Sequence, residues 1–362
     1  MKPSTKLDKI PPYLFVEIDR KIDEAKAKGI DVISLGVGDP DMPTLPHIVK
    51  ALHEAVDDVS THNYPPYQGT KEFRQACCKW MKKRFNVDID SEKEITALIG
   101  SKEGIAHVFM AFIDEGDYTL VPDPAYPVYR NATYIAGGTP YFMPIGPENN
   151  YLPDLDAIPA EIAQKAKLIF LNYPNNPTGA VANLDYFKKV LEFAKKYDIL
   201  ICHDQAYCEM TYDGYVAPSF LQIEGAKDYC LEFFSHSKTY NMTGWRIGWA
   251  AGSEKAMKAL KVIKNNIDSG IFKAVQKAGV VALETPQAEI DKLNEMYKRR
   301  RDIVTKGLRE LGWKFEDPVA TFYLWLPVPP GMTSAQFAEV MLEKAAVVVP
   351  PGSGYGPKGE GF

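Results

Sequence analysis

A lysine preceded by two nearby serines lies in the part of the chain that is best suited to covalent chemistry. This stretch, Ser235–Gly248, reads SHSKTYNMTGWRIG. Lys238 supplies an amine, and Ser235 and Ser237 supply hydroxyl groups. Arg246 supplies a planar cation that can bind a phosphate through two parallel hydrogen bonds. The set predicts binding of an aldehyde that also carries a phosphate, with the amine forming a Schiff base.

Pyridoxal 5'-phosphate (PLP) is a cofactor with these two groups, and it also requires an acidic partner for its ring nitrogen. Lysines flanked by serines are common in surface loops too. The prediction of PLP therefore depends on whether distant residues supply the other contacts that this cofactor needs.

The residues before Lys238 indicate how it is positioned. Cys230–Phe234 is an apolar and aromatic run that predicts a buried strand, so Lys238 would follow a strand's carboxyl end, where ligands bind in open α/β sheets. Similar strand signals alternate with helical patterns along the middle of the chain, at residues 118–121, 139–143, 167–172, 198–203, 230–234 and 247–251. This alternation predicts an α/β fold with a mostly parallel sheet covered on both faces.

Two further loops leave strand ends and carry suitable side chains. Asp204 is the predicted partner of the pyridine nitrogen, because a carboxylate keeps that nitrogen protonated. Asn176 and Tyr207 can donate to the phenolate oxygen, and Tyr126 can stack on the ring. Taken singly, the aspartate could be a helix cap, the asparagine a turn residue and Tyr126 a core residue. Their shared position at strand ends favours the cofactor.

Upstream segments add a glycine turn and a second anion site. A helix over residues 13–28 and a strand over 31–35 lead into Gly36–Asp41, where two glycines allow the backbone to approach a ligand closely. Gly100–Gly104 opens a helix whose amino terminus can bind phosphate. Tyr64, in a proline-rich loop before a helix over 70–85, is either a core residue or a hydroxyl directed at an anion.

Length and composition bound the class of protein. The chain has 362 residues, with 46% hydrophobic and 25% charged residues and a net charge of −5, which is typical of a globular enzyme and argues against nucleic-acid binding. Five unpatterned cysteines favour buried thiols in a reducing compartment, and no metal-ligand spacing is present. No signal peptide or membrane span is evident, so a cytoplasmic protein with no membrane partner is expected.

Three motifs resemble those of the class I/II aminotransferases of PLP fold type I. They are Asn-Asn-Pro-Thr-Gly at 175–179, Asp-x-x-Tyr at 204–207, and Ser-x-Ser-Lys followed by Gly-Trp-Arg-x-Gly within 235–248. The resemblance runs from about residue 10 to the end. It implies a large domain with a mostly parallel seven-stranded sheet between helices, together with a smaller α+β domain.

The resemblance also implies roles for individual residues. Lys238, Asp204 and Tyr207 would be catalytic, with Lys238 forming the Schiff base and then shuttling a proton. Tyr64 would reach the phosphate from the other subunit of a homodimer. The implied cofactor-binding residues are Ser101, Lys102, Tyr126, Asn176, Asp204, Tyr207, Ser235, Ser237, Lys238, Arg246 and Tyr64.

Pro11–Phe15 and Gly100–Gly104 resemble the branch of the family that exchanges an amino group between LL-2,6-diaminopimelate and 2-oxoglutarate in lysine biosynthesis. The substrate would then contact Tyr13, Gly38, Lys102 and Asn176. Residues 1–45 would form an arm and part of the small domain, 46–285 the large PLP-binding domain, and 286–362 the small domain. Strand patterns at Trp313–Phe315, Thr321–Trp325 and Val347–Val349, with a helix over 333–344, are expected in the last part.

One departure from the family concerns the substrate carboxylate. Family members bind it through an arginine shortly after a glycine-rich loop, and this chain ends at Phe362 before such a residue. We therefore expect either a fragment whose small domain is incomplete or a protein that does not catalyse amino transfer. Three alternatives stay open: another class I aminotransferase acting on aspartate, alanine or an aromatic amino acid; a PLP carbon-sulfur β-lyase; and a truncated, non-catalytic PLP-binding paralogue.

Overall fold

A seven-stranded sheet, with strand order β2-β8-β7-β6-β5-β3-β4, forms the centre of the fold. In the computed structural model, residues 1–11 and 14–362 are described. Strand β8 runs antiparallel to β2 and β7, whereas the other neighbours pair in parallel, which confirms the predicted mostly parallel sheet. The strands are β2 Ile95–Leu98, β3 Tyr118–Asp123, β4 Thr139–Pro144, β5 Ala166–Asn172, β6 Leu200–Asp204, β7 Cys230–Ser235 and β8 Gly248–Gly252.

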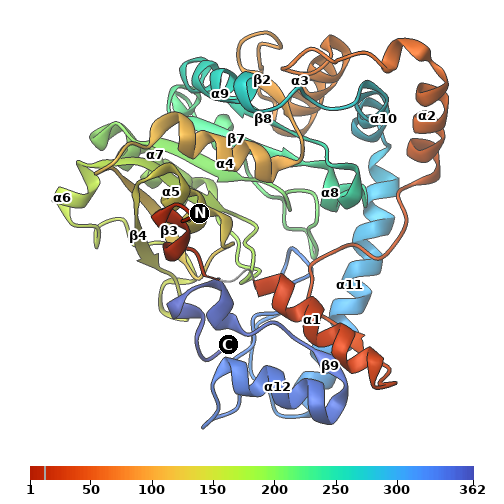
Figure 1. The fold of residues 1–362 in the computed structure, drawn as a ribbon, viewed down its shortest axis with the longest axis vertical. Coiled ribbons are helices and arrows are strands. Elements are labelled where there is room, and N and C mark those ends of the chain that lie inside the picture. Colours follow the sequence, from red (N-terminus) through yellow and green to blue (C-terminus); the bar gives the residue numbers. More distant parts are fainter. Residues whose placement is uncertain (12–13) are drawn as a thin grey trace.

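Helices pack on both faces of this sheet, as Figure 1 shows, because alternate strand residues point to opposite sides. In β5, Leu168 and Phe170 belong to one core and Ile169 and Leu171 to the other. The first core is covered by α4 Ser101–Phe112, α5 Val128–Ala136 and α9 Glu254–Ile267, and the second by α2 Pro46–Asp57, α3 Lys71–Phe85, α7 Leu184–Tyr197 and α10 Lys273–Leu283. Two single-turn helices complete this part, α6 Ala160–Ala163 and α8 His236–Thr239.

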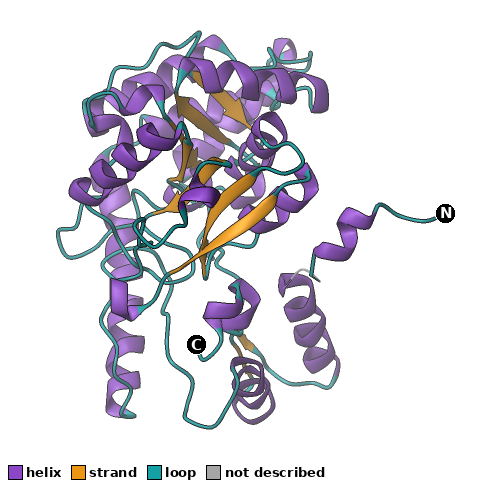
Figure 2. Cartoon of the chain, turned by 90° about the vertical axis from the view of Figure 1, so that its left-hand side faces the viewer, coloured by secondary structure: helices purple, strands orange, loops and turns teal. Residues whose placement is uncertain are grey.

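The two ends of the chain meet in a second, smaller sheet. Strand β1 (Ile33–Ser34) pairs in parallel with β9 (Val347–Val348), and Ile18 and Ile22 of α1 (Leu14–Ala27) pack on Val348. Helix α11 (Gln287–Glu310) descends from the large sheet toward this unit, which also contains α12 (Ser334–Ala345), and Figure 2 shows the small sheet apart from the large one. The N-terminal arm thus contacts the C-terminal part, while the exact domain boundaries remain a prediction.

Two predicted strands of the small unit are wrong. Neither Trp313–Phe315 nor Thr321–Trp325 is a strand. Thr321 has a φ of 66°, outside the extended region, and its N–H bonds the carbonyl of Met210 rather than a neighbouring strand. Trp313 instead packs on Phe337 of α12, whereas Phe322 and Tyr323 pack on Tyr207, and Tyr323 lines the cavity described below.

Within the described part of the chain, none of the helices combines the length and apolar character that crossing a bilayer requires.

Candidate active site

The carboxyl ends of β5, β6 and β7 open into a cavity of about 350 Å³. Its walls bring together residues that lie far apart in the sequence. Those predicted from sequence are Gly38, Ser101, Lys102, Tyr126, Asn176, Asp204, Tyr207, Ser235, Ser237, Lys238 and Arg246.

One end of the cavity is built to bind an anion. Ser101 and Lys102 begin α4 and both line the cavity, so the positive end of that helix faces the site. Arg246 lies against Gly100, where an added Cβ would come within 2.4 Å of the arginine Nη2. Gly100 has a φ of 74°, so glycine serves both the backbone conformation and the close approach of the guanidinium group. Ser235 caps α8 by accepting a hydrogen bond from the N–H of Ser237 (3.1 Å).

A buried carboxylate faces the cavity from another side. Asp204 ends β6, and its oxygens accept hydrogen bonds from the Tyr129 hydroxyl (3.0 Å) and the Ala206 N–H (3.2 Å). Burial raises the pKa of Asp204 to about 6, and the hydrogen bond from Tyr129 opposes that rise. A cationic N–H group in the cavity would stabilise the ionised carboxylate.

Asn172 links the two neighbouring strand ends. Its side-chain N–H donates to the Asp204 carbonyl (2.8 Å), and its Oδ1 accepts from the Asn176 backbone N–H (2.6 Å). Asn176 is thereby held at the cavity wall, and its own Oδ1 is buried without a hydrogen-bond partner among the described residues. A buried polar atom in this condition indicates a site that favours a polar ligand.

The Lys238 amine lies inside the cavity, where its Nζ donates to the Gly38 carbonyl (2.6 Å) and lies 5.6 Å from the centre of the Phe322 ring. Burial lowers the pKa of Lys238 to about 8, since removal from water disfavours the ammonium form; Asp39 opposes this shift and Arg246 adds to it. A larger fraction of neutral, nucleophilic amine is therefore present near neutral pH than for a lysine in water.

The arrangement combines an amine, a carboxylate and an anion site around one cavity, and comparison with known proteins places it in a family. The family of class I and II aminotransferases matches residues 30–361. This chain belongs to the class I and II aminotransferases. Members of this family depend on PLP.

Similar proteins match along the full length of this aminotransferase. LL-diaminopimelate aminotransferase 2 of Trichormus variabilis is 55% identical over 363 residues, covering 100% of this chain and 93% of that protein. LL-diaminopimelate aminotransferase of Moorella thermoacetica is 54% identical with the same coverage. Among solved structures, substrate-bound BacF from Bacillus subtilis has a TM-score of 0.95 at 38% identity, covering 99% of this chain and 92% of that one. An aspartate aminotransferase mutant from Thermus thermophilus has a TM-score of 0.93 at 28% identity, covering 100% and 94%.

Three residues of the aminotransferase site were not predicted from sequence. Tyr129 lies almost one helical turn beyond Tyr126, and Asn172 ends the predicted strand over 167–172, three residues before the motif at 175–179, so both positions are close to recognised signals. Tyr323 lies in the segment for which the sequence pattern predicts a strand. Its hydroxyl lies 2.6 Å from the Tyr207 hydroxyl, and burial raises the pKa of Tyr207 well above its usual value, so Tyr207 stays protonated and able to donate.

Other predicted site residues lie outside the cavity or outside the described chain. Tyr64 does not line the cavity and is 85% exposed. Tyr13 lies outside the described residues. The given sequence has no arginine after its glycine-rich loop. How the substrate carboxylate is bound therefore stays untested.

Proposed function

We propose that this chain holds PLP on Lys238 and transfers an amino group between LL-2,6-diaminopimelate and 2-oxoglutarate, a step of lysine biosynthesis. The observation that carries the proposal is 55% identity, over the whole chain, to an LL-diaminopimelate aminotransferase. The donor set of the cavity fits a phosphorylated pyridine aldehyde, because the anion site, the buried carboxylate and the amine all face the same space.

Different residues of the cavity would bind the phosphate, hold the ring nitrogen and move the proton. Arg246, Ser235, Ser237 and the backbone at Ser101–Lys102 would hold the phosphate, and Asp204 would keep the proton on the ring nitrogen. When bound, PLP supplies an electron-withdrawing ring that stabilises negative charge at the substrate Cα. Lys238 Nζ would take the proton from the substrate Cα and deliver it to the carbon that had carried the aldehyde, a 1,3-proton transfer that its lowered pKa would favour near neutral pH.

Three uncharged groups would complete the contacts to the ring. Asn176 and Tyr207 would donate to its phenolate oxygen, and Tyr126 would stack on its face. Gly38, Lys102, Asn176 and Tyr13 are the proposed substrate contacts. Tyr64 would serve the partner subunit of a homodimer, and its 85% exposure fits a side chain that reaches away from its own chain.

The test is an amino-transfer assay on the purified protein loaded with PLP. Glutamate should form from 2-oxoglutarate with LL-diaminopimelate as donor, faster than with aspartate, alanine or aromatic amino acids, and Lys238→Ala should abolish it. Pyruvate and ammonia from a cysteine conjugate without a keto acid would indicate the β-lyase instead. Cofactor binding without any turnover would indicate the non-catalytic alternative.

A further inference from the structure

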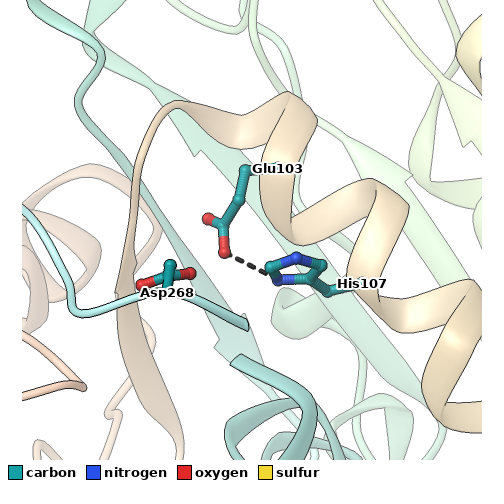
Figure 3. A group of neighbouring side chains, drawn as sticks. All are labelled: Glu103, His107 and Asp268. Atoms are coloured by element: carbon teal, nitrogen blue, oxygen red, sulfur yellow. Dashed lines mark ion pairs between the residues drawn. The ribbon is translucent and has the colours of Figure 1, made fainter. Parts of the chain in front are cut away.

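A buried lysine outside the cavity holds two carboxylates together. Lys264 of α9 is fully buried, and its Nζ lies 2.8 and 2.9 Å from the two oxygens of Asp268 and 3.3 Å from Oε1 of Glu103. Figure 3 shows Glu103 and His107 on one helix, with Asp268 beside them. His107 Nδ1 lies 2.7 Å from Glu103 Oε1. The ligand atoms of these three residues lie within 4.8 Å of one another, a spacing that suits a cation, and the Lys264 ammonium is the cation that contacts both carboxylates.

The Glu103 side of this cluster reaches the proposed phosphate site. Glu103 lies in the first turn of α4, and its Oε2 accepts a hydrogen bond from the Ile99 N–H (3.0 Å). This bond spans Gly100, the residue on which Arg246 lies. Glu103 therefore holds the turn that directs the amino end of α4, and with it Ser101, toward the anion.

The Asp268 side reaches the loop that carries Tyr64. Asp268 Oδ1 accepts a hydrogen bond from the Gly270 N–H (2.7 Å), which fixes a turn just after α9. Gly270, with a φ of 86°, packs on residues 65–67, since an added Cβ would lie 3.1 Å from Pro65 Cγ and 3.4 Å from the Pro66 carbonyl oxygen. Tyr64 directly precedes this packed segment and extends from the molecule.

We infer that Lys264 is a positioning residue that links the phosphate site of its own subunit to the loop that completes the phosphate site of the partner. This inference rests on the proposed function, in which PLP occupies the cavity and Tyr64 crosses to the other subunit. Without the ammonium, Glu103 and Asp268 would be like charges held close together in a partly buried place, and their repulsion would displace the turns at Ile99 and Gly270. A single change at Lys264 should therefore weaken two phosphate sites.

The first experiment measures the dissociation constant of PLP for Lys264→Met in the full-length dimer. We expect PLP to bind roughly tenfold more weakly, comparable to the loss of an outer partner of a bound ion. Lys258→Met is the matched control, because Lys258 is an exposed lysine of the same helix, and it should bind PLP like the wild type. The ³¹P chemical shift of the bound phosphate should also move only in Lys264→Met. Wild-type affinity and an unchanged shift in Lys264→Met would overturn the inference.

A hybrid dimer tests the link between subunits. One subunit carries Lys238→Ala with Lys264→Met, and the other is wild type, so absorbance of covalently bound cofactor reports only the wild-type site. That site has an intact Lys264 but receives Tyr64 from the altered subunit. We expect weaker PLP binding than in a hybrid carrying Lys238→Ala alone, similar to a hybrid with Lys238→Ala and Tyr64→Phe. Equal affinity in the test and control hybrids would overturn the inference.

The milder Asp268→Asn substitution serves if Lys264→Met does not fold. It keeps the side-chain volume but weakens the ion pair between Lys264 and residue 268, which supports the Tyr64 loop. In the hybrid dimer it should therefore lower the PLP affinity of the wild-type site. An unchanged affinity would again overturn the inference. Failure of the wild-type dimer to bind PLP would instead contradict the proposed function.

Discussion

Asp204 and Lys238 face one cavity, and burial moves the pKa values of both toward neutrality. The pKa of the carboxyl group is raised to about 6 and that of the amine lowered to about 8, because each loses the water that would solvate its charge. Both groups are thus poised for a ligand that brings a cationic ring nitrogen to Asp204 and an electrophilic carbon to Lys238. A carboxyl group and an amine whose pKa values both lie near neutrality allow one site to supply acid and base chemistry near pH 7.

The raised pKa of Asp204 predicts that the carboxylate costs stability in the cofactor-free protein. A carboxyl group whose pKa rises from 3.8 to about 6 on folding stabilises the native state only while protonated, and this contribution is lost as pH rises through about 6. Asp204→Asn should therefore increase the free energy of unfolding at pH 7, by an amount approaching about 3 kcal/mol. Urea denaturation of the two apoproteins measures this. The difference should vanish at pH 3.5, and a less stable Asp204→Asn at pH 7 would contradict the argument.

The lowered pKa of Lys238 predicts the pH dependence of cofactor attachment. The neutral fraction of an amine with a pKa of about 8 rises roughly tenfold from pH 7 to 9 and then levels off. The rate at which apoprotein becomes covalently loaded should follow the same curve, measured by stopped-flow absorbance. A rate that continued to climb toward pH 10.5 would show that the amine behaves as an ordinary solvated lysine.

At the scale of elements, two segments from opposite ends of the chain close over the lysine. A Cβ added to Gly38 would lie 2.3 Å from the Tyr323 hydroxyl and 2.8 Å from Phe322 Cε2. The Gly38 carbonyl also accepts the Lys238 hydrogen bond. The absence of a side chain at residue 38 thus allows the N-terminal turn and the 321–323 segment to meet beside the reactive amine.

Gly38→Ala should separate these segments and misplace groups at the substrate side of the cavity. We expect kcat/KM to fall at least about tenfold, because small displacements of positioned groups are costly in catalysis. Gly307→Ala is the control: this α11 glycine has open space around its Cα, so alanine should leave kcat/KM unchanged and raise the unfolding free energy by about 0.5–1 kcal/mol. Wild-type kcat/KM for Gly38→Ala would show that the close contact has no role.

The sequence predicted elements whose signals are local and missed contacts that depend on tertiary structure. Buried runs such as Cys230–Phe234 specify strands because both faces of a central strand are covered. Thr321–Trp325 has a strand-like composition, yet Thr321 has a φ of 66°, its N–H bonds the Met210 carbonyl, and Tyr323 lines the cavity instead. Tyr129 and Tyr323 belong to the site because of partners 75 and 116 residues away, which no local pattern specifies.

For the whole molecule, the central expectation is a homodimer in which each subunit completes the other's site. Tyr64 is 85% exposed, Tyr67 50% and Phe272 42%, so these aromatic side chains are accessible to a partner subunit. Sedimentation equilibrium should give twice the chain mass. Tyr64→Phe should keep this mass but bind PLP several-fold more weakly, since it loses one hydrogen bond to phosphate. A monomer with full activity would contradict this arrangement.

The claim that Lys238 carries the cofactor is tested most directly by trapping it. The protein is incubated with PLP, reduced with borohydride, digested and examined by mass spectrometry. We predict one reduced pyridoxyl group per chain, on the peptide that contains Lys238, and none on Lys102 in the same cavity. Labelling at another lysine, or a chain that remains unlabelled, would contradict the assignment of the site.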